Sequence, residues 1–362
     1  MNDIHPLPVV PPRWPDEACG SWITRVADVY GLGAHRLIDY AIGYDPTMQQ
    51  LPLNATIESL MPALPIEALA QLLRLENRVS MVSTLITAPR GWVIEDPADT
   101  PICPLCWTND IAKGQTPYPR NSWFQAWRVI CAVHGCLLDS LCAMNTKRRK
   151  QKPPFKLVTL STRIPAAKIL RRPLRGRYPT PKLHIVTALR AIAEMETVIG
   201  QSLGGVAPNP KRWGPVDAAG FVTVVRDVTT FLLSNFTERP RPSLASFNLH
   251  RVADPGPVRC FASHPRYIRT RKHNADATTT LTSIADPAVR RAALFWAREL
   301  MHFSSMQRWI PLINRIARVK RQAAILRRQT SDGLAWLIDR SHDWPADYRK
   351  SWWRDFAIVA IP

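Results

Sequence analysis

The chain has 362 residues, 46% of them hydrophobic, which is enough for two or three domains with buried cores. It has no run of eighteen apolar residues and no basic leader before an apolar stretch, so the sequence argues against a membrane span and a signal peptide and predicts a cytoplasmic protein. Seven cysteines, an odd number, argue against a disulfide framework, and a formal net charge of +20 points to a nucleic-acid partner.

The positive charge is concentrated after residue 146. Residues 1–146 contain 9 Lys and Arg against 14 Asp and Glu, a net charge of −5. Residues 147–362 contain 39 against 14, a net charge of +25. A solvated surface alone does not need such an excess, so we expect nucleic acid to meet the second part of the chain.

The N-terminal region begins with an arm and continues as helices. Residues 1–15 contain five prolines and predict an extended arm. Apolar residues then recur at helical spacing in "SWITRVADVY", and "AHRLIDYAI" predicts a second short helix after a glycine-containing turn. We expect a helical domain over residues 16–97.

Part of this domain has the spacing of a helix-turn-helix motif. Ala27, Gly31 and Leu37 provide a small residue, a turn glycine and a buried aliphatic residue at typical offsets. In a DNA reader the second helix would present four residues to the major groove: His35, Arg36, Asp39 and Tyr40. Because this region is net negative, contact with another protein is the favoured use.

Residues 98–145 form a cysteine-rich block that predicts a metal site. Cys103 and Cys106 are two residues apart, and Cys131 and His134 repeat that spacing after a gap of 24 residues. A tetrahedral zinc ion takes four thiolate or imidazole ligands. The pattern therefore predicts a structural Cys3His zinc ribbon or knuckle with all four positions filled by protein, which leaves no open position for catalysis.

The block also allows other interpretations. A redox C-x-x-C pair would need a surrounding βαβ pattern, which is absent. Cys136 and Cys142 are alternative ligands. Trp123, Phe124 and Trp127 lie between the two knuckles, where we expect an apolar wall rather than a base-stacking platform.

The remainder of the chain reads as a linker followed by helices. From 147 to 182 there are 13 basic residues, six prolines and no acidic residue, which predicts a basic Pro-rich linker over residues 146–183. Helical periodicity resumes over residues 184–362 and predicts a basic helical domain. The expected fold is mainly α, with a helix-turn-helix N-terminal domain, an inserted Cys3His zinc lobe and a C-terminal helical domain.

Basic residues of the linker and of an Arg- and His-rich loop are the candidate DNA contacts. They are Lys147, Arg148, Arg149, Lys150, Arg171, Arg172, Arg175, Arg177, Arg266, Arg269, Arg271 and Lys272. In the same loop, Cys260, His264 and His273 form a looser set with only three ligands. We expect its histidines to lie near phosphates rather than to bind a second metal ion.

Three common catalytic patterns are absent from the sequence. They are G-x-x-x-x-G-K-[ST], G-x-G-x-x-G and H-E-x-x-H. Acidic residues are scarce in the basic part, which disfavours a nuclease or transposase. We therefore expect no catalytic residues and no enzyme activity.

Several of these segments together resemble the TniQ family, the target-selection proteins of bacterial transposons. "PDEACGSWITRVADVYGL" is similar to the family's opening, and "CPLC" followed by "SWFQAWRVICAVHGCLLDSLC" resembles its zinc segment. "WPADYRKSW" is similar to a Trp-Pro element near the end of some members. The resemblance covers roughly Trp14 to Cys142. Many members carry a further C-x-x-C after the block, whereas here Cys142 is followed by "AMNTKRRK".

The resemblance implies a non-enzymatic adaptor in the bacterial cytoplasm. Such an adaptor marks the insertion target and recruits an AAA+ ATPase regulator of transposition. Some members bind DNA directly, and others bind a CRISPR effector complex, often as homodimers. We expect the acidic, zinc-bearing part to meet proteins and the basic part to meet DNA. The rival interpretation is a sequence-specific helix-turn-helix transcriptional regulator.

Overall fold

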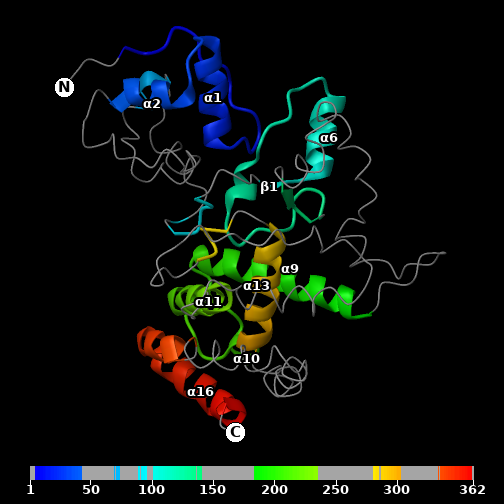
Figure 1. The fold of residues 1–362 in the computed structure, drawn as a ribbon, viewed down its shortest axis with the longest axis vertical. Helices are drawn as coiled ribbons and strands as arrows, with labels where there is room; N and C mark the ends of the chain where they lie inside the picture. The colour runs from blue at the N-terminus through cyan, green and yellow to red at the C-terminus, as the bar shows by residue number, and fades with distance from the viewer. Residues whose placement is uncertain are drawn as a thin grey trace, which may run out of the picture. The chain divides into compact units, whose positions relative to one another are not determined.

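The structure, a computed structural model, describes 5–42, 69, 71–73, 89, 91–95, 101–135, 137–140, 183–234, 280–284, 287–302, 333 and 335–360. Its elements are mainly helical, with one small two-stranded sheet, which confirms the predicted fold class at this level (Figure 1). Among the described helices, we find none with the length and hydrophobicity to span a bilayer.

The chain divides into two compact units. Unit 1 comprises Met1–Arg163 and Thr282–Asp286, and unit 2 comprises Ile164–Leu281 and Pro287–Pro362. The finer five-part division drawn from the sequence stays a prediction.

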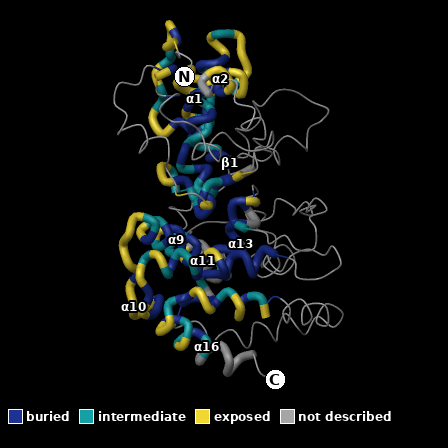
Figure 2. The backbone as a smooth tube through the Cα atoms, turned by 90° about the vertical axis from the view of Figure 1, so that its left-hand side faces the viewer, coloured by how far each residue is buried: buried dark blue, intermediate teal, exposed yellow. Residues whose placement is uncertain are grey.

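Unit 1 begins with a pair of helices. Helix α1 (Cys19–Val29) buries Trp22, Ile23, Val26 and Ala27, and helix α2 (Ala34–Ile42) buries Leu37 and Ile38 (Figure 2). The two helices contact one another. The turn between them contains Gly31 at φ +65°, a backbone conformation that favours glycine. The predicted helix pair is therefore present, while its assignment as a DNA-reading motif stays a prediction.

A small lobe follows in unit 1 over residues 101–140, and it is called the metal lobe because it contains the four predicted metal ligands. Strands β1 (Pro101–Ile102) and β2 (Asp139–Ser140) pair antiparallel, so they join the two ends of the lobe. Helix α6 (Pro104–Ala112) begins directly after β1, with proline at its first position, and the short 3-10 helix η4 (Asn121–Phe124) follows.

A distant segment completes unit 1. The Glu95 backbone N–H donates to the carbonyl of Thr282 at 2.9 Å, and the Thr282 hydroxyl donates to Glu95 Oε1 at 3.0 Å. The neighbouring residue Ile94 donates its backbone N–H to the carbonyl of Phe124 at 2.9 Å. Because unit 1 uses two separate parts of the chain, its experiments are best done on the full-length protein.

Unit 2 is built around three helices in mutual contact. They are α9 (Leu183–Leu203), α11 (Ala218–Leu233) and α13 (Pro287–Met301). Their buried side chains include Phe221, Val224, Val228, Leu294 and Ala297. Short helix α10 (Pro210–Trp213), 3-10 helix η8 (Ser341–Asp343) and helix α16 (Ala346–Ala360) complete the described part.

The Trp-Pro element of the sequence is anchored on α11. Trp344 Nε1–H donates to Asp227 Oδ2 at 2.9 Å, and the Trp344 ring packs edge-on against Trp352. A Cβ atom added at Gly220 would lie 2.4 Å from Pro345 Cγ. Only a glycine at this position of α11 allows the proline to approach so closely.

Gly220→Ala is therefore expected to destabilise unit 2. The overpacking costs about 1–3 kcal/mol, and the better helix propensity of alanine returns about 1 kcal/mol of it. Hydrogen-exchange protection of α11 and α16 measures the loss. Gly33→Ala is the matched control, because a Cβ at Gly33 meets nothing within 4 Å. Unchanged protection in Gly220→Ala would contradict the close contact.

Asp227 gives unit 2 a pH dependence. Burial raises the pKa of Asp227 above its ordinary 3.8, although the hydrogen bond from Trp344 and the guanidinium of Arg340 oppose the rise. A raised pKa in the folded state means that protonated Asp227 stabilises the fold. Its contribution to the free energy of unfolding is full below pH 3.8 and is lost as the pH rises through the folded-state pKa. Wild type should thus lose stability relative to Asp227→Asn from about pH 4 upward. Chemical denaturation of both proteins at several pH values measures the gap, and a gap that closes with rising pH would contradict the shift.

Candidate metal centre and nucleic-acid interface

Four ligand atoms from the two cysteine knuckles meet in the metal lobe. The sulfurs of Cys103, Cys106 and Cys131 and Nδ1 of His134 all lie within 4.8 Å of one another. The Cys106 and Cys131 sulfurs are 3.7 Å apart. His134 Nδ1 lies 3.5, 3.2 and 3.8 Å from the sulfurs of Cys103, Cys106 and Cys131.

The Cys106–Cys131 distance matches the edge of a tetrahedral zinc site, and the three sulfur–nitrogen distances lie on either side of the ideal value. With Zn–S near 2.3 Å and Zn–N near 2.0–2.1 Å, a regular tetrahedron has S–S edges of about 3.8 Å and S–N edges of about 3.6 Å. A disulfide would need its sulfurs about 2.05 Å apart. No disulfide joins the described cysteines. The cluster can therefore hold a metal ion.

Local backbone structure holds each knuckle. Cys103 is the N-cap of α6, and its sulfur accepts the backbone N–H of Cys106 at 3.4 Å. In the second knuckle Gly135 has φ +61° and donates its N–H to the carbonyl of Cys131 at 2.8 Å. The turn therefore favours glycine at the position after His134, because other residues rarely adopt a positive φ.

The electrostatics of the cluster favour a cation. Hydrogen bonds with Cys103 and Cys131, together with burial, raise the pKa of the Cys106 thiol. Burial lowers the pKa of His134, but hydrogen bonds with Cys131 and Cys103 outweigh it, so the pKa is raised overall. Three neighbouring buried sulfurs cannot all be thiolates without a nearby positive charge, and a bound dication supplies that charge.

Apolar side chains surround the cluster. Ile102, Trp123 and Leu138 are buried together with the three cysteines, and Leu105 and Trp107 pack against them. Phe124 and Trp127 are also buried, and Trp127 packs edge-on against Trp92. The aromatic residues between the knuckles thus form an apolar wall, as predicted, and are not free for stacking on bases.

The comparison with protein families identifies this part of the chain. Residues 8–138 match the family model TniQ. This matching region is called the TniQ domain below. No curated protein and no solved structure matches the chain. The TniQ domain includes α1, α2 and all four residues of the cluster.

The opening motif of the TniQ domain is held by a buried carboxylate. Glu17 is completely buried and accepts from Arg25 Nε at 2.8 Å and Nη2 at 2.6 Å. It also accepts from the Ser21 hydroxyl at 3.1 Å and the Trp14 backbone N–H at 3.0 Å. The acidic residue, serine and arginine of the motif therefore form one hydrogen-bonded cluster.

A stack of aromatic and guanidinium groups links this cluster to the metal lobe. The Arg25 guanidinium lies 3.7 Å from the Trp14 ring centroid, and the Trp14 and Tyr118 centroids are 4.7 Å apart. Arg120 covers Tyr118 at 3.4 Å. It also forms a bidentate pair with buried Asp110 of α6 at 2.6 and 2.8 Å. Sequence reasoning missed these pairs, because no local spacing shows which charges will be buried together.

The predicted arm is attached to unit 1 where it is described. Residues 5–15 contain no helix or strand. Leu7 N–H donates to the carbonyl of Leu72 at 2.9 Å, and Trp22 Nε1–H donates to the carbonyl of Pro11 at 2.8 Å.

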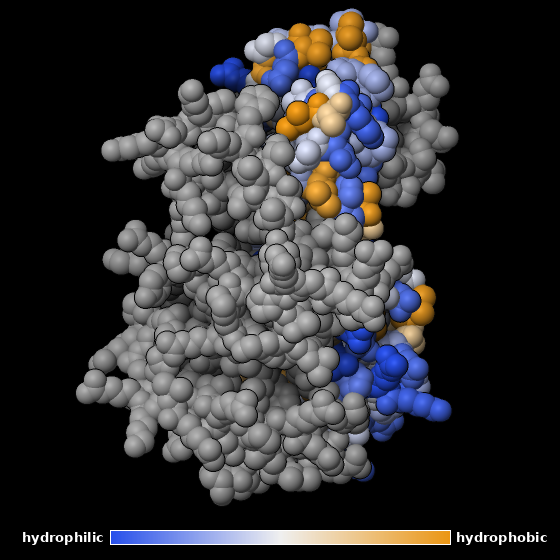
Figure 3. Space-filling view, turned by 90° about the vertical axis from the view of Figure 1, so that its right-hand side faces the viewer, coloured by the Kyte–Doolittle hydropathy of each residue, from blue (hydrophilic) through white to orange (hydrophobic). Residues whose placement is uncertain are grey.

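The exposed side of α2 carries the residues expected to face DNA. All four are exposed: His35, Arg36, Asp39 and Tyr40. Exposed large apolar residues of the TniQ domain are Val9, Val29, Leu32, Tyr40 and Val133, whereas unit 2 has Val206 and Ile338 among its described residues. Figure 3 shows hydrophobic residues among hydrophilic ones on one face of the described surface.

The twelve candidate DNA contacts of the linker and loop lie outside the described residues, as do Cys136, Cys142, Cys260, His264 and His273. Their use for DNA or metal binding stays a prediction.

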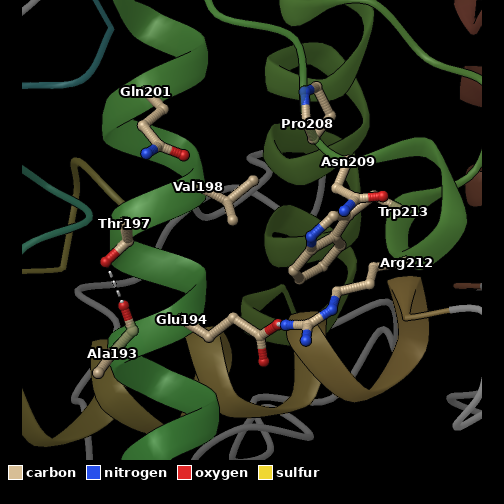
Figure 4. Close-up of a pocket in the computed structure, with 9 residues that line it drawn as sticks. All are labelled: Ala193, Glu194, Thr197, Val198, Gln201, Pro208, Asn209, Arg212 and Trp213. Carbon is tan, nitrogen blue, oxygen red and sulfur yellow. Dashed lines mark hydrogen bonds and ion pairs between the residues drawn. The ribbon is translucent and has the colours of Figure 1, made fainter.

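Unit 2 has a pocket of about 400 Å³ between α9 and the segment around α10 (Figure 4). Glu194 lies in it and pairs with Arg212 at 3.0 Å and with Arg298 at 2.9 Å. Val198 and Trp213 line its apolar part. Glu194 therefore pairs with both guanidinium groups, but its single negative charge neutralises only one of them.

Proposed function

We propose that the protein is a non-enzymatic target-selection adaptor of DNA transposition. In this proposal the TniQ domain contacts an AAA+ ATPase regulator, and the basic remainder binds target DNA or a DNA-bound complex. The match of residues 8–138 to TniQ carries the proposal. The charge division supports it, because the first 146 residues have a net charge of −5 and the remainder +25.

We propose further that the cluster of the metal lobe holds one structural zinc ion. Cys103, Cys106, Cys131 and His134 would be its ligands, and the edge lengths of the cluster support zinc. When bound, the ion would supply positive charge and a fixed tetrahedral link, with no open position for a reacting water. The four ligands would then join α6, through the ion, to the turn that ends at Gly135.

The exposed apolar residues of the TniQ domain suggest where a protein partner binds. Val29 of α1 is 52% exposed, and Val206 in unit 2 is 57% exposed. Val29→Glu should weaken binding to the AAA+ ATPase of the same transposon, because it places a charge in the apolar contact. Val206→Glu is the matched control and should leave binding unchanged.

A pull-down with purified, nuclease-treated proteins measures this binding. Wild type and Val206→Glu should retain the ATPase, and Val29→Glu should retain less of it. Loss of all binding after nuclease treatment would contradict direct recruitment. The homodimer and the CRISPR effector complex that the resemblance implies are further expectations. The molecular mass of the protein and of its complexes in solution would test them.

The second candidate function is a sequence-specific helix-turn-helix regulator. The exposed polar side of α2 favours it, because the described helix leaves Arg36 and its neighbours open to a groove. A direct reader loses about 1–3 kcal/mol and relaxes specificity at one base position when such an arginine is removed. The adaptor proposal instead predicts no change in sequence preference for Arg36→Ala.

A further inference from the structure

Both nitrogens of the His134 imidazole have close polar neighbours. Nδ1 faces the three sulfurs, at 3.2–3.8 Å, and Nε2 lies 3.1 Å from the side-chain amide Nδ2 of Asn109. Asn109 is on α6, three residues after Cys106, so the two lie on the same face of the helix. One helix therefore brings both a ligand and an amide to this histidine.

The chemistry of imidazole fixes which atoms can meet. A neutral imidazole has one N–H, and the nitrogen that binds a metal ion must offer its lone pair. If Nδ1 is the ligand, Nε2 carries the hydrogen and is a donor. The amide Nδ2 of Asn109 is also a donor, and two donors cannot form a hydrogen bond.

The asparagine amide resolves this conflict by a half-turn. Its oxygen and nitrogen are almost identical in size, and the hydrogen-bond network decides their assignment. Rotation by about 180° about χ2 places Oδ1 where Nδ2 now lies, at the same 3.1 Å from His134 Nε2. In that position Oδ1 accepts the Nε2–H hydrogen bond.

We infer that Asn109 is a positioning residue that holds His134 in the tautomer that binds metal through Nδ1. The inference rests on the proposed zinc centre and extends it by one residue. A hydrogen bond to the distal nitrogen fixes the ring orientation and makes the ligand nitrogen more basic. Loss of such a partner commonly weakens metal binding by about 10- to 100-fold.

Three substitutions in the full-length protein test this role. Asn109→Ala removes the acceptor and should weaken zinc binding by about 10- to 100-fold in competition with a chelator. Asn109→Asp keeps an acceptor oxygen and should restore affinity to near wild type. Thr108→Ala changes the neighbouring residue of α6, whose hydroxyl donates to the carbonyl of Pro104, and should bind zinc as wild type does.

Nitrogen NMR of the zinc-loaded wild type gives a readout that a purely structural role would not produce. We expect Nδ1 of His134 to show metal ligation and Nε2 to carry the hydrogen. Metal ligation at Nε2, wild-type affinity in Asn109→Ala, or failure of Asn109→Asp to restore affinity would overturn the inference while leaving the zinc centre intact. A wild-type protein that binds no zinc would overturn both.

Discussion

Cys103→Ser in the full-length protein is expected to lose stoichiometric zinc and to unfold the metal lobe. Wild type should contain about one zinc per chain by elemental analysis. Structural zinc contributes on the order of 10 kcal/mol in zinc-finger peptides at neutral pH, which equals the whole stability of a typical domain. In its described residues the lobe has two short strands, a nine-residue helix, one short 3-10 helix and a small core to replace it.

Hydrogen-exchange protection of α6 and the zinc content per chain measure the result together. Cys19→Ser is the matched control, because Cys19 is also a buried cysteine but lies in α1, outside the cluster. The control should keep its zinc and the protection of α6. Full zinc content in Cys103→Ser, or unchanged melting of metal-free wild type, would show that the four residues are not a structural site.

Arg25→Gln is expected to destabilise the TniQ domain by about 3 kcal/mol. The substitution leaves the carboxylate of Glu17 buried without its guanidinium partner, and such an uncompensated charge typically costs about 3–5 kcal/mol. Partial exposure of Arg25, at 21%, places the expected cost at the lower end. The substitution also removes the guanidinium that stacks on Trp14.

A double-mutant cycle separates the pair from the two single residues. Glu17→Gln removes the buried charge and keeps an acceptor, so Glu17→Gln combined with Arg25→Gln should be more stable than Arg25→Gln alone. Arg36→Gln, at an exposed position of α2, should change stability by less than about 0.5 kcal/mol. Denaturation midpoints of these proteins and of wild type measure the differences. Additive effects of the two substitutions would contradict a coupled buried pair.

The spacing of nearby residues was enough to predict the first two helices and the four ligands from the sequence. The helices at Cys19–Val29 and Ala34–Ile42 follow from apolar residues at helical intervals around a glycine turn. The four ligands follow from two short spacings, because a tetrahedral ion restricts which residue types and separations can surround it. Both features depend on residues close together in the chain.

Long-range pairs could not be derived in the same way. The hydrogen bonds between Glu95 and Thr282 join residues 187 positions apart, and no periodicity marks either residue. The contact of Asn109 with His134 depends on how α6 approaches the second knuckle, since the two residues are 25 positions apart. The hydrogen bond from Trp344 to Asp227 joins residues 117 positions apart. The Trp-Pro element could therefore be recognised in the sequence, but its partner could not.

The salt dependence of DNA binding by the full-length protein tests the central claim, a protein-binding TniQ domain and a DNA-binding basic part. The variant to compare with wild type replaces Lys147, Arg148, Arg149 and Lys150 with glutamine. The logarithm of affinity falls with the logarithm of salt by about 0.9 for each phosphate that the protein neutralises. We predict a slope shallower by about 1 for each phosphate that the fourfold variant no longer neutralises, and an unchanged slope for Arg36→Gln. A wild-type slope in the fourfold variant, with a shallower slope in Arg36→Gln, would contradict the account and place DNA binding on α2.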